Sequence, residues 1–200
     1  KSDSEYFSKV YKNIIYVPAF HSNDAVTSKT GKGDYVLYHG NLSVVENHQA
    51  ALYVLKKIAA NSKREFIIAG KEPLDALRKE IKKYPNVTLV YNPSFETMNS
   101  LIANAHITIL PTFQSTGIKL KLLNSLYKGR FCIVNKPMIL NTDLENLCLV
   151  EDNAEQAVEY IESLFTQEFT EVHRDFRSQI LTANFSNQTN ALKIASILWQ

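Results

Sequence analysis

The stretch that decides the fold is ITILPTFQSTGIKLKLLNSLYKG, residues 107–129. It predicts a buried strand, a loop and a helix, in that order. Residues 107–110 form a short β-branched apolar run, and Pro111 marks the end of the strand. Gly129 stands where a helix C-terminus favours glycine. Between them, apolar residues recur at helical spacing at Ile118, Leu122 and Leu126.

Two lysines lie near the predicted start of this helix. Ser115 or Thr116 is the expected N-cap, so Lys119 and Lys121 fall within about the first turn and a half. The N-terminus of a helix carries a partial positive charge, which disfavours each cation there by ~0.3–1 kcal/mol. No acidic residue in the stretch offsets them. Together with Gly117, the lysines predict an anion site at the carboxyl end of the strand. The alternative is that both lysines are simply solvated.

The composition is that of an ordinary globular domain, or of one lobe of a larger enzyme. The 200 residues include 45% hydrophobic residues, with 22 basic against 20 acidic side chains. No basic block is interleaved with aromatic residues, so we expect no nucleic-acid partner. The start at Lys1, without an initiator methionine, leads us to expect a further region upstream.

The sequence also bears on the cellular compartment. Cys132 and Cys148 lie in apolar runs without metal-ligand spacing, which indicates core thiols in a reducing environment. No apolar stretch approaches the ~18–20 residues of a transmembrane helix, and no signal peptide is visible. We expect a cytoplasmic protein, and peripheral contact with the inner face of the membrane stays open.

Apolar runs and helical patterns alternate along the middle of the chain. The apolar runs mostly lack polar alternation, as expected for strands covered on both faces. Strands are expected at residues 14–17, 35–39, 65–69, 87–91, 107–110, 131–134 and 147–150. Helices are expected at residues 46–60, 73–84, 95–105 and 154–165, and as two pieces after residue 173, with Ser186 as an N-cap. This order predicts an α/β fold with a Rossmann-like, doubly wound parallel sheet.

A glycine ends the first strand of this sheet. Gly40 is followed by a loop and a helix, the arrangement in which α/β folds bind phosphates. A single glycine is not the dinucleotide fingerprint, and no Walker pattern occurs. Ordinary loop and capping roles are equally open for the polar residues here, which are Asn41, Ser43, Glu46 and Asn47.

Other polar residues are expected near the same edge of the sheet. Lys71 follows the second strand, Tyr91 and Asn92 follow the third, and plain loop roles remain open for them. His39 precedes Gly40 at this edge, and a later loop with Asp143 and Glu145 could close over a ligand. No histidines have zinc spacing and no Ser–His–Asp order occurs, so the catalytic residues stay unassigned.

The order of these parts resembles the C-terminal, donor-binding domain of GT-B glycosyltransferases of the family 4 type. Four segments carry the resemblance, which covers residues 17–165. They are YVLYHGNLSVVENHQAALYVL, REFIIAGKEPLDALRKEI, NVTLVYN followed by MNSLIANAHITILPT, and TGIKLKLLNSLYKGRFCIVN. The tail is similar to the final helices of the family, which cross back to the N-terminal lobe.

The resemblance fails at the family's charged positions. The family has two glutamates eight positions apart, for the donor sugar and the ribose, and this chain has Thr116 and Asn124 there. The family's diphosphate-binding Arg and Lys correspond to Asn41 and, approximately, Glu46. Lys119 stands instead at the family's second glycine position, so we expect it to supply the lost positive charge.

The resemblance implies the following site. Gly40, Asn41, Leu42 and Gly117 would surround the donor diphosphate, with Lys119 as its counter-charge. Asn124 would bond the ribose, while Thr116 and Gln114 would touch the sugar. Positions two apart on a helix face about 200° apart, so Lys121 is not expected to reach the same phosphate as Lys119.

The resemblance also implies a domain organisation and a reaction. Residues 1–24 would be a linker or strand from a preceding lobe, 25–170 the nucleotide-sugar-binding domain, and 171–200 helices that pack toward that lobe. The donor would be a nucleoside-diphosphate sugar and the acceptor a glycan or lipid-linked molecule. A catalytic base would lie in the N-terminal lobe, and neither cofactor nor metal is expected. A sugar-nucleotide epimerase or hydrolase of the same fold, and a non-catalytic nucleotide-binding or scaffold module, remain alternatives.

Overall fold

A six-stranded sheet forms the centre of the structure, a computed structural model that describes residues 2–114 and 119–199. All its strand pairs are parallel, and their order is β3-β2-β1-β4-β5-β6. The strands are β1 (Tyr35–Asn41), β2 (Glu65–Lys71), β3 (Val87–Tyr91), β4 (Ile107–Leu110), β5 (Phe131–Val134) and β6 (Leu149–Val150). The chain adds β2 and β3 on one side of β1 and then β4, β5 and β6 on the other side. This change of side between β1 and β4 is that of the doubly wound fold predicted from the sequence.

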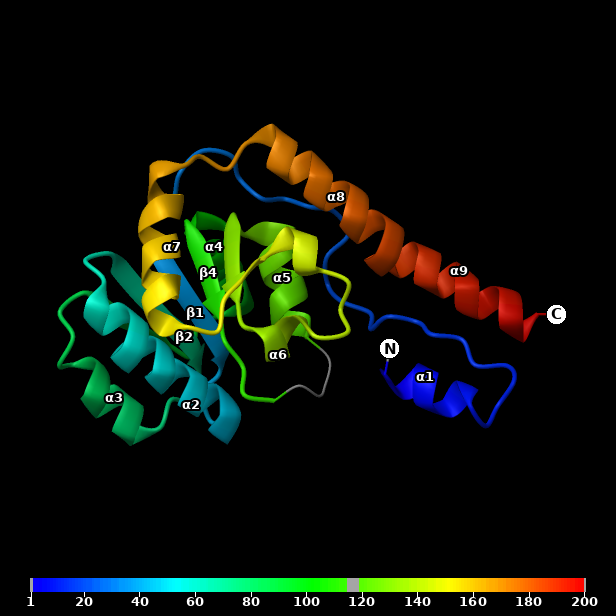
Figure 1. Cartoon of the computed structure of the whole chain (residues 1–200), viewed down its shortest axis with the longest axis horizontal. Helices are drawn as coiled ribbons and strands as arrows, with labels where there is room; N and C mark the ends of the chain where they lie inside the picture. Colours follow the sequence, from blue (N-terminus) through cyan, green and yellow to red (C-terminus); the bar gives the residue numbers. More distant parts are fainter. Residues whose placement is uncertain (1, 115–118, 200) are drawn as a thin grey trace.

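Helices cover both faces of the sheet, as Figure 1 shows. Alternate strand residues such as Val36 and Tyr38 pack under one helical layer, and Leu37 packs under the other. The first layer holds α2 (Val45–Tyr53), α3 (Asp75–Ile81) and α7 (Ala154–Thr166); the second holds α4 (Phe95–Asn104) and α5 (Leu120–Lys128). Because both faces are covered, the strands consist mostly of apolar residues.

Two glycines face each other where β1 and β2 end. Gly40 is paired in register with Gly70. A Cβ on Gly70 would lie 1.9 Å from the carbonyl oxygen of Gly40, so no larger residue fits there without moving the backbone. A Cβ on Gly40 would lie 3.2 Å from Cγ of Asn47, a side-chain contact that can adjust. Gly70 therefore permits the close approach of the two strands.

The strand predictions are confirmed with one exception. The first two strands of the sheet each run two residues further than expected, and the last begins two residues later, after the 3₁₀ turn Glu145–Leu147. The strand expected at residues 14–17 is wrong. This segment has no regular structure. Ile15 is 48% exposed, so the apolar run is not covered as a strand of the sheet would be.

The helix predictions are confirmed in place but not in every boundary. The long helix expected at residues 46–60 is α2, followed by a π-helical turn (Val54–Ile58) and a 3₁₀ turn (Ala59–Asn61). Ser186 caps α9 by accepting from the backbone N–H of Thr189. Helix α5 begins at Leu120 with Lys119 in the N-cap position, later than expected, while Ser115 and Thr116 lie outside the described residues.

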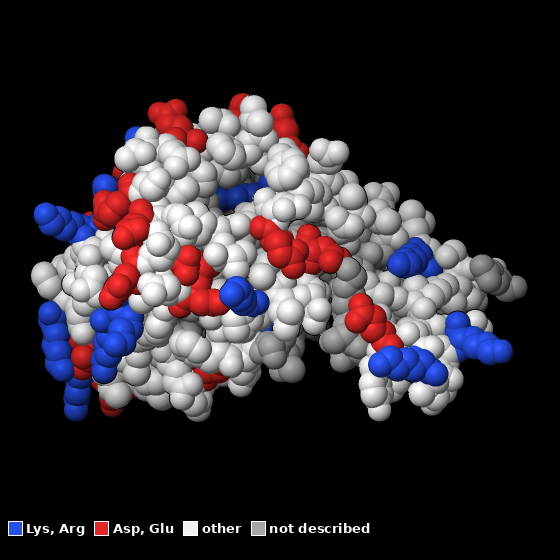
Figure 2. Space-filling view, in the orientation of Figure 1, with Lys and Arg blue, Asp and Glu red and all other residues white. Residues whose placement is uncertain are grey.

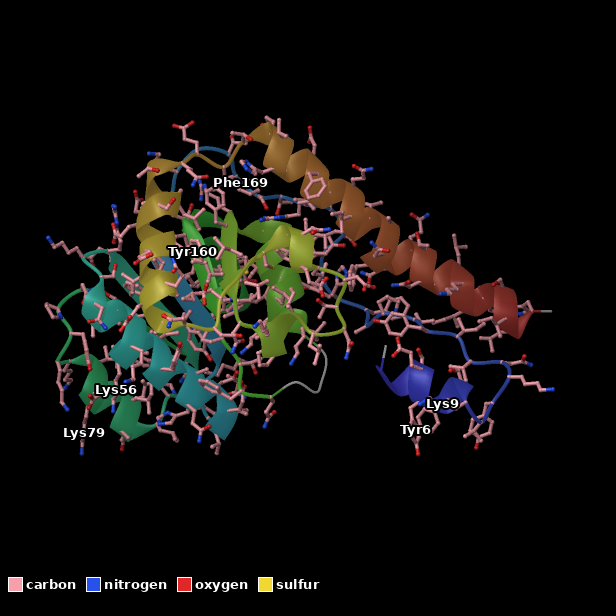
Figure 3. All side chains as sticks on the ribbon, viewed as in Figure 1. Tyr6, Lys9, Lys56, Lys79, Tyr160 and Phe169 are labelled. Carbon is pink, nitrogen blue, oxygen red and sulfur yellow. The ribbon has the colours of Figure 1, made fainter. Side chains whose placement is uncertain are left out.

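The two ends of the chain lie on the same side of the molecule (Figure 1). Helix α8 (Glu171–Phe185) packs on the domain through Leu181 and Phe185, and α9 (Asn187–Leu198) continues beyond it. The segment before the sheet runs along these helices, held by hydrogen bonds between His21 and Asn187. At its start is α1 (Ser2–Ser8), from which the side chain of Tyr6 points away from the sheet, as Figure 3 shows.

The remaining short helix, α6 (Lys136–Ile139), follows β5. Its Met138 and Ile139 are buried against α5. Among the described residues, no helix is both long and apolar enough to cross a bilayer.

Candidate functional site

A pocket of about 370 Å³ opens at the carboxyl edge of the sheet, where the strand order reverses between β1 and β4. Ligands of open α/β sheets bind at such a switch point. Figure 1 shows the ends of these strands close to the start of α5. The walls come from three stretches that are distant in sequence. They are Gly40, Asn41, Glu46, Asn47, Thr112, Gln114, Lys119, Leu120, Lys121 and Met138.

The end of β1 forms the first wall. The side-chain oxygen of Asn41 accepts from the backbone N–H of Ser43 (3.2 Å) and from its hydroxyl (2.9 Å). The carbonyl oxygen of Asn41 accepts from Nδ2 of Asn47 at 3.0 Å. The loop after β1 is therefore tied to the start of α2, and it keeps a fixed shape beside the pocket.

The segment after β4 forms the opposite wall, with Thr112 at its centre. Oγ1 of Thr112 donates to Oε1 of Glu46. Asn135, just after β5, accepts from the Thr112 N–H at 3.0 Å and donates to its carbonyl at 2.7 Å. Thr112 is 3% exposed, so these bonds satisfy a buried polar residue. The loop is thereby held against both α2 and β5.

Two ammonium groups enter the same pocket. Nζ of Lys119 donates to the carbonyl oxygen of Gln114 at 3.0 Å. Nζ of Lys121 donates to Oδ1 of Asn47 at 2.9 Å and lies 5.6 Å from the centre of the Tyr38 ring. Lys121 was not expected to reach the phosphate that Lys119 binds, and the structure places both lysines in the lining of one pocket. Lys119 precedes the first residue of α5, so the angle between helical positions does not separate the two side chains.

Burial and neighbouring charges act on these lysines in opposite directions. Burial lowers the pKa of both Lys119 and Lys121, while the carboxylate of Glu46 raises it. The ammonium of Lys119 further lowers the pKa of Lys121. Two cations and one carboxylate leave the described lining of the pocket with a positive balance. The N-terminal end of α5, which begins at Leu120, adds to it, because a helix N-terminus carries a partial positive charge. An anion with several oxygens, such as a phosphate, fits this arrangement.

The structure brings together some of the predicted site residues. Gly40, Asn41, Gln114 and Lys119 all line the pocket. Leu42 does not: its side chain is buried in the core, and its N–H donates to Lys71 O at 2.9 Å. Its backbone amide is therefore already bonded. Gly117 and Thr116, also predicted here, lie outside the described residues.

Asn124 lies apart from the lining of the pocket. It follows Lys121 by almost one helical turn and accepts a hydrogen bond of 2.8 Å from Nδ2 of Asn23. Asn23 is itself 4% exposed, and its side-chain oxygen is buried without a partner among the described residues. The position predicted to bond a ribose thus contacts the segment that precedes the sheet.

Other polar residues named from the sequence stand outside the pocket. His39 is buried behind it, where Nε2 lies 2.8 Å from Oγ of Ser125. Burial first, and then the charge of Lys121, lower its pKa to about 3. Asn92 accepts from the N–H of Glu72 at 2.7 Å in the adjacent loops. Asp143 and Glu145 do not line the pocket.

Sequence reasoning missed three contributors. Thr112 stands directly after the proline that follows β4, and Asn135 directly after β5. A polar residue next to the carboxyl end of a strand is the sequence pattern that could have indicated both as site residues. Met138 lines the pocket from α6, a helix that no sequence pattern predicted. No group of three or more metal-ligating His, Cys, Asp or Glu side chains occurs within residues 2–114 and 119–199.

Solved structures share this fold at low sequence identity. TarM from S. aureus, as a mutant in complex with fondaparinux, alpha-GlcNAc-glycerol and UDP, superposes with a TM-score of 0.69 at 12% identity, covering 98% of this chain and 42% of that chain. A glycosyltransferase from Rickettsia africae gives 0.64 at 12%, covering 98% and 51%, and a GtfA/B complex gives 0.63 at 15%, covering 95% and 41%. This chain thus spans about half, or less, of the length of these structures.

No match was found among curated protein sequences. A family model, by contrast, agrees with the structural likenesses. The model described as "Glycosyl transferases group 1" matches residues 20–181, which include the whole sheet and every described residue that lines the pocket. The chain therefore belongs to the group 1 family of glycosyl transferases.

Proposed function

We propose that this chain is the donor-binding domain of a glycosyltransferase that uses a nucleoside-diphosphate sugar. The observation that carries the proposal is the pocket at the β1–β4 switch point, into which both Lys119 and Lys121 project. The hexosyl group would pass to a glycan or lipid-linked acceptor held by a further lobe, which would also supply any catalytic base. The protein would act in the cytoplasm, at or near the inner face of a membrane.

The lysines support a diphosphate as the bound group. A leaving nucleoside diphosphate gains negative charge, and preorganised cations lower the energy of that state. Lys119 and Lys121 lie on either side of Leu120 at the start of α5, so two ammonium groups and the helix terminus can share one diphosphate. Both ammonium groups already bond neutral oxygens, on Gln114 and Asn47, which a phosphate oxygen can replace.

The other lining residues fit the sugar side of such a donor. Asn41 and Gln114 offer amide groups, which both donate to and accept from hydroxyls. The carboxylate of Glu46 lies in the same pocket, bonded to Thr112, and is an acceptor for a sugar hydroxyl. Glu46 would take this role in a chain that has Thr116 and Asn124 at the positions of the family's paired glutamates.

Calorimetric titration with UDP, GDP and their hexose conjugates tests the proposal. We expect Lys119→Ala and Lys121→Ala each to weaken diphosphate binding by about tenfold or more, because a charge-assisted hydrogen bond contributes roughly 1.5–3 kcal/mol. Binding of the uncharged nucleoside should change far less.

Lys128→Ala is the matched control. Lys128 lies at the other end of α5 and does not line the pocket, so its removal should leave the affinity unchanged. Equal affinity of the wild type and of both pocket variants would contradict the role of the lysines. Absence of any nucleotide binding would reject the donor-binding proposal and favour a non-catalytic scaffold.

A further inference from the structure

Two cysteines face each other at the end of the sheet that lies away from the pocket. The register that pairs Ile133 of β5 with Leu149 of β6, continued by one residue, places Cys148 directly before β6 and opposite Cys132. Facing residues of such strands lie about 4.8 Å apart and point to the same side. This separation is within the roughly 4.4–6.8 Å over which disulfides join Cα atoms.

Both cysteines line one cavity of about 180 Å³ between the edge of the sheet and α8. Figure 2 shows the surface hollowed below the start of α8, with a basic side chain at the floor of the hollow. A water molecule occupies ~30 Å³ of liquid, so a molecule as small as hydrogen peroxide has room to enter. Cys132 is 3% exposed and Cys148 is partly exposed, so the cavity is their route to solvent.

The surroundings distinguish the two sulfurs. A hydrogen bond from the thiol of Cys148 lowers the pKa of Cys132, and the Thr108 hydroxyl and the Arg177 guanidinium act in the same direction. The same hydrogen bond, together with burial, raises the pKa of Cys148. Arg177 also lines the cavity, with its guanidinium 4.7 Å from the centre of the Phe169 ring. A cysteine with a lowered pKa beside a buried cation, paired with a second cysteine of raised pKa, is the arrangement of a peroxide-oxidised pair.

We propose that Cys132 and Cys148 form a redox-sensitive dithiol, which hydrogen peroxide converts into a reversible disulfide between β5 and β6. This site is separate from the nucleotide-sugar pocket, and the proposal does not depend on the proposed function.

The chemistry balances in two steps. The Cys132 thiolate attacks one peroxide oxygen, the O–O bond breaks, and the departing hydroxide takes up a proton as water, leaving a sulfenic acid on Cys132. The sulfur of Cys148 then attacks the sulfenic sulfur, and hydroxide leaves and takes the Cys148 proton as a second water. Two thiols and one peroxide give one disulfide and two waters, so the two sulfurs supply both electrons.

The test is to treat the reduced, folded chain with hydrogen peroxide and to measure the intact mass and the free thiols. We expect the mass to fall by that of two hydrogen atoms, both thiols to be lost together, and one proteolytic fragment to join Cys132 to Cys148. Dithiothreitol should restore both thiols. Persistence of both thiols, addition of oxygen without the cross-link, or a disulfide between two chains would overturn the proposal.

Single variants separate the roles of the two sulfurs. In Cys148→Ser the first step has no second thiol, so Cys132 should accumulate as a sulfenic acid that dimedone traps. In Cys132→Ser the remaining thiol is still buried, which raises its pKa, and its reaction should be at least about tenfold slower. Equal trapping rates in the two variants would overturn the assignment of Cys132 as the thiolate. Far-UV circular dichroism checks that both variants are folded.

Discussion

At the scale of single residues, His39 is a titratable group that the fold holds in one protonation state. It is 5% exposed, its Nε2 bonds Ser125, and its pKa is lowered to about 3 by burial and by the charge of Lys121. The folded protein therefore holds this imidazole neutral at physiological pH. The unfolded chain, in which the side chain is hydrated, takes up a proton near pH 6.5.

This difference predicts a pH dependence of stability. Between pH 6.5 and about 3 the unfolded state binds one more proton at His39 than the folded state, so the free energy of unfolding decreases as the pH falls. The loss is up to ~1.4 kcal/mol per pH unit below 6.5. Urea unfolding of the wild type and of His39→Gln, compared at pH 6.5 and 5, measures it. The variant keeps a side chain that can bond Ser125 but does not titrate, so identical pH slopes would contradict the prediction.

The site shows which residues a sequence can place and which it cannot. Asn41 and Lys119 both line the pocket, and each lies at the limit of a regular element that the sequence places to within a few residues: Asn41 ends β1, and Lys119 precedes α5. Lys121 was not expected at the phosphate of Lys119, because a helix that starts at Ser115 or Thr116 would turn the two lysines to different sides. The helix starts at Leu120, so Lys119 lies before its first residue. Asn124 was assigned through the resemblance alone, and its bond to Asn23 joins residues that are 101 positions apart. No local pattern predicts such a contact.

At the scale of elements, sequence patterns identified the strands of the sheet. Short apolar runs bounded by glycine, proline or asparagine were sufficient, because a strand covered on both faces is mostly apolar. The run at residues 14–17 has the same composition but no neighbouring strand. An apolar composition shows that a segment can be buried, but a strand also needs a neighbouring strand with which its backbone forms hydrogen bonds.

The β1–β2 pair gives a prediction at this scale. Gly70→Ala should destabilise the protein by about 3 kcal/mol, because the added Cβ meets the Gly40 carbonyl oxygen at 1.9 Å and the paired backbones must separate. Gly40→Ala, where the nearest atom belongs to the Asn47 side chain, is the matched comparison and should cost less. Equilibrium unfolding in urea measures both. Equal losses in the two variants would show that strand separation is not the limiting contact.

At the scale of the whole molecule, Arg177 joins segments that are far apart in sequence. Its guanidinium donates to the Ser28 hydroxyl and to the carbonyl oxygens of Leu126, Gly129 and Arg130. Burial lowers its pKa to about 10, so it remains charged at neutral pH. The side chain connects α8 to the end of α5 and to the segment that precedes the sheet.

Loss of this connection should be costly. Arg177→Met removes the donor and leaves four buried acceptors, for which we expect about 3–5 kcal/mol of lost stability. Arg174→Met is the control on the same helix, since the ion pair of Arg174 with Glu171 is partly exposed to solvent and is worth less than about 1 kcal/mol. Chemical unfolding of both variants measures the difference. A loss for Arg177→Met no larger than for Arg174→Met would contradict the role of this residue.

The position of Arg177 has a consequence for the order in which the chain is made. Its three carbonyl acceptors are synthesised 47 to 51 residues before it. While the nascent chain elongates from the N-terminus, these oxygens lack the guanidinium and are left to bond water. The surface of α5 and β5 that α8 covers stays exposed until α8 leaves the ribosome. Translation speed over residues 131–177 therefore sets how long the unfinished sheet edge, with β5 and β6, is exposed to other chains and to chaperones.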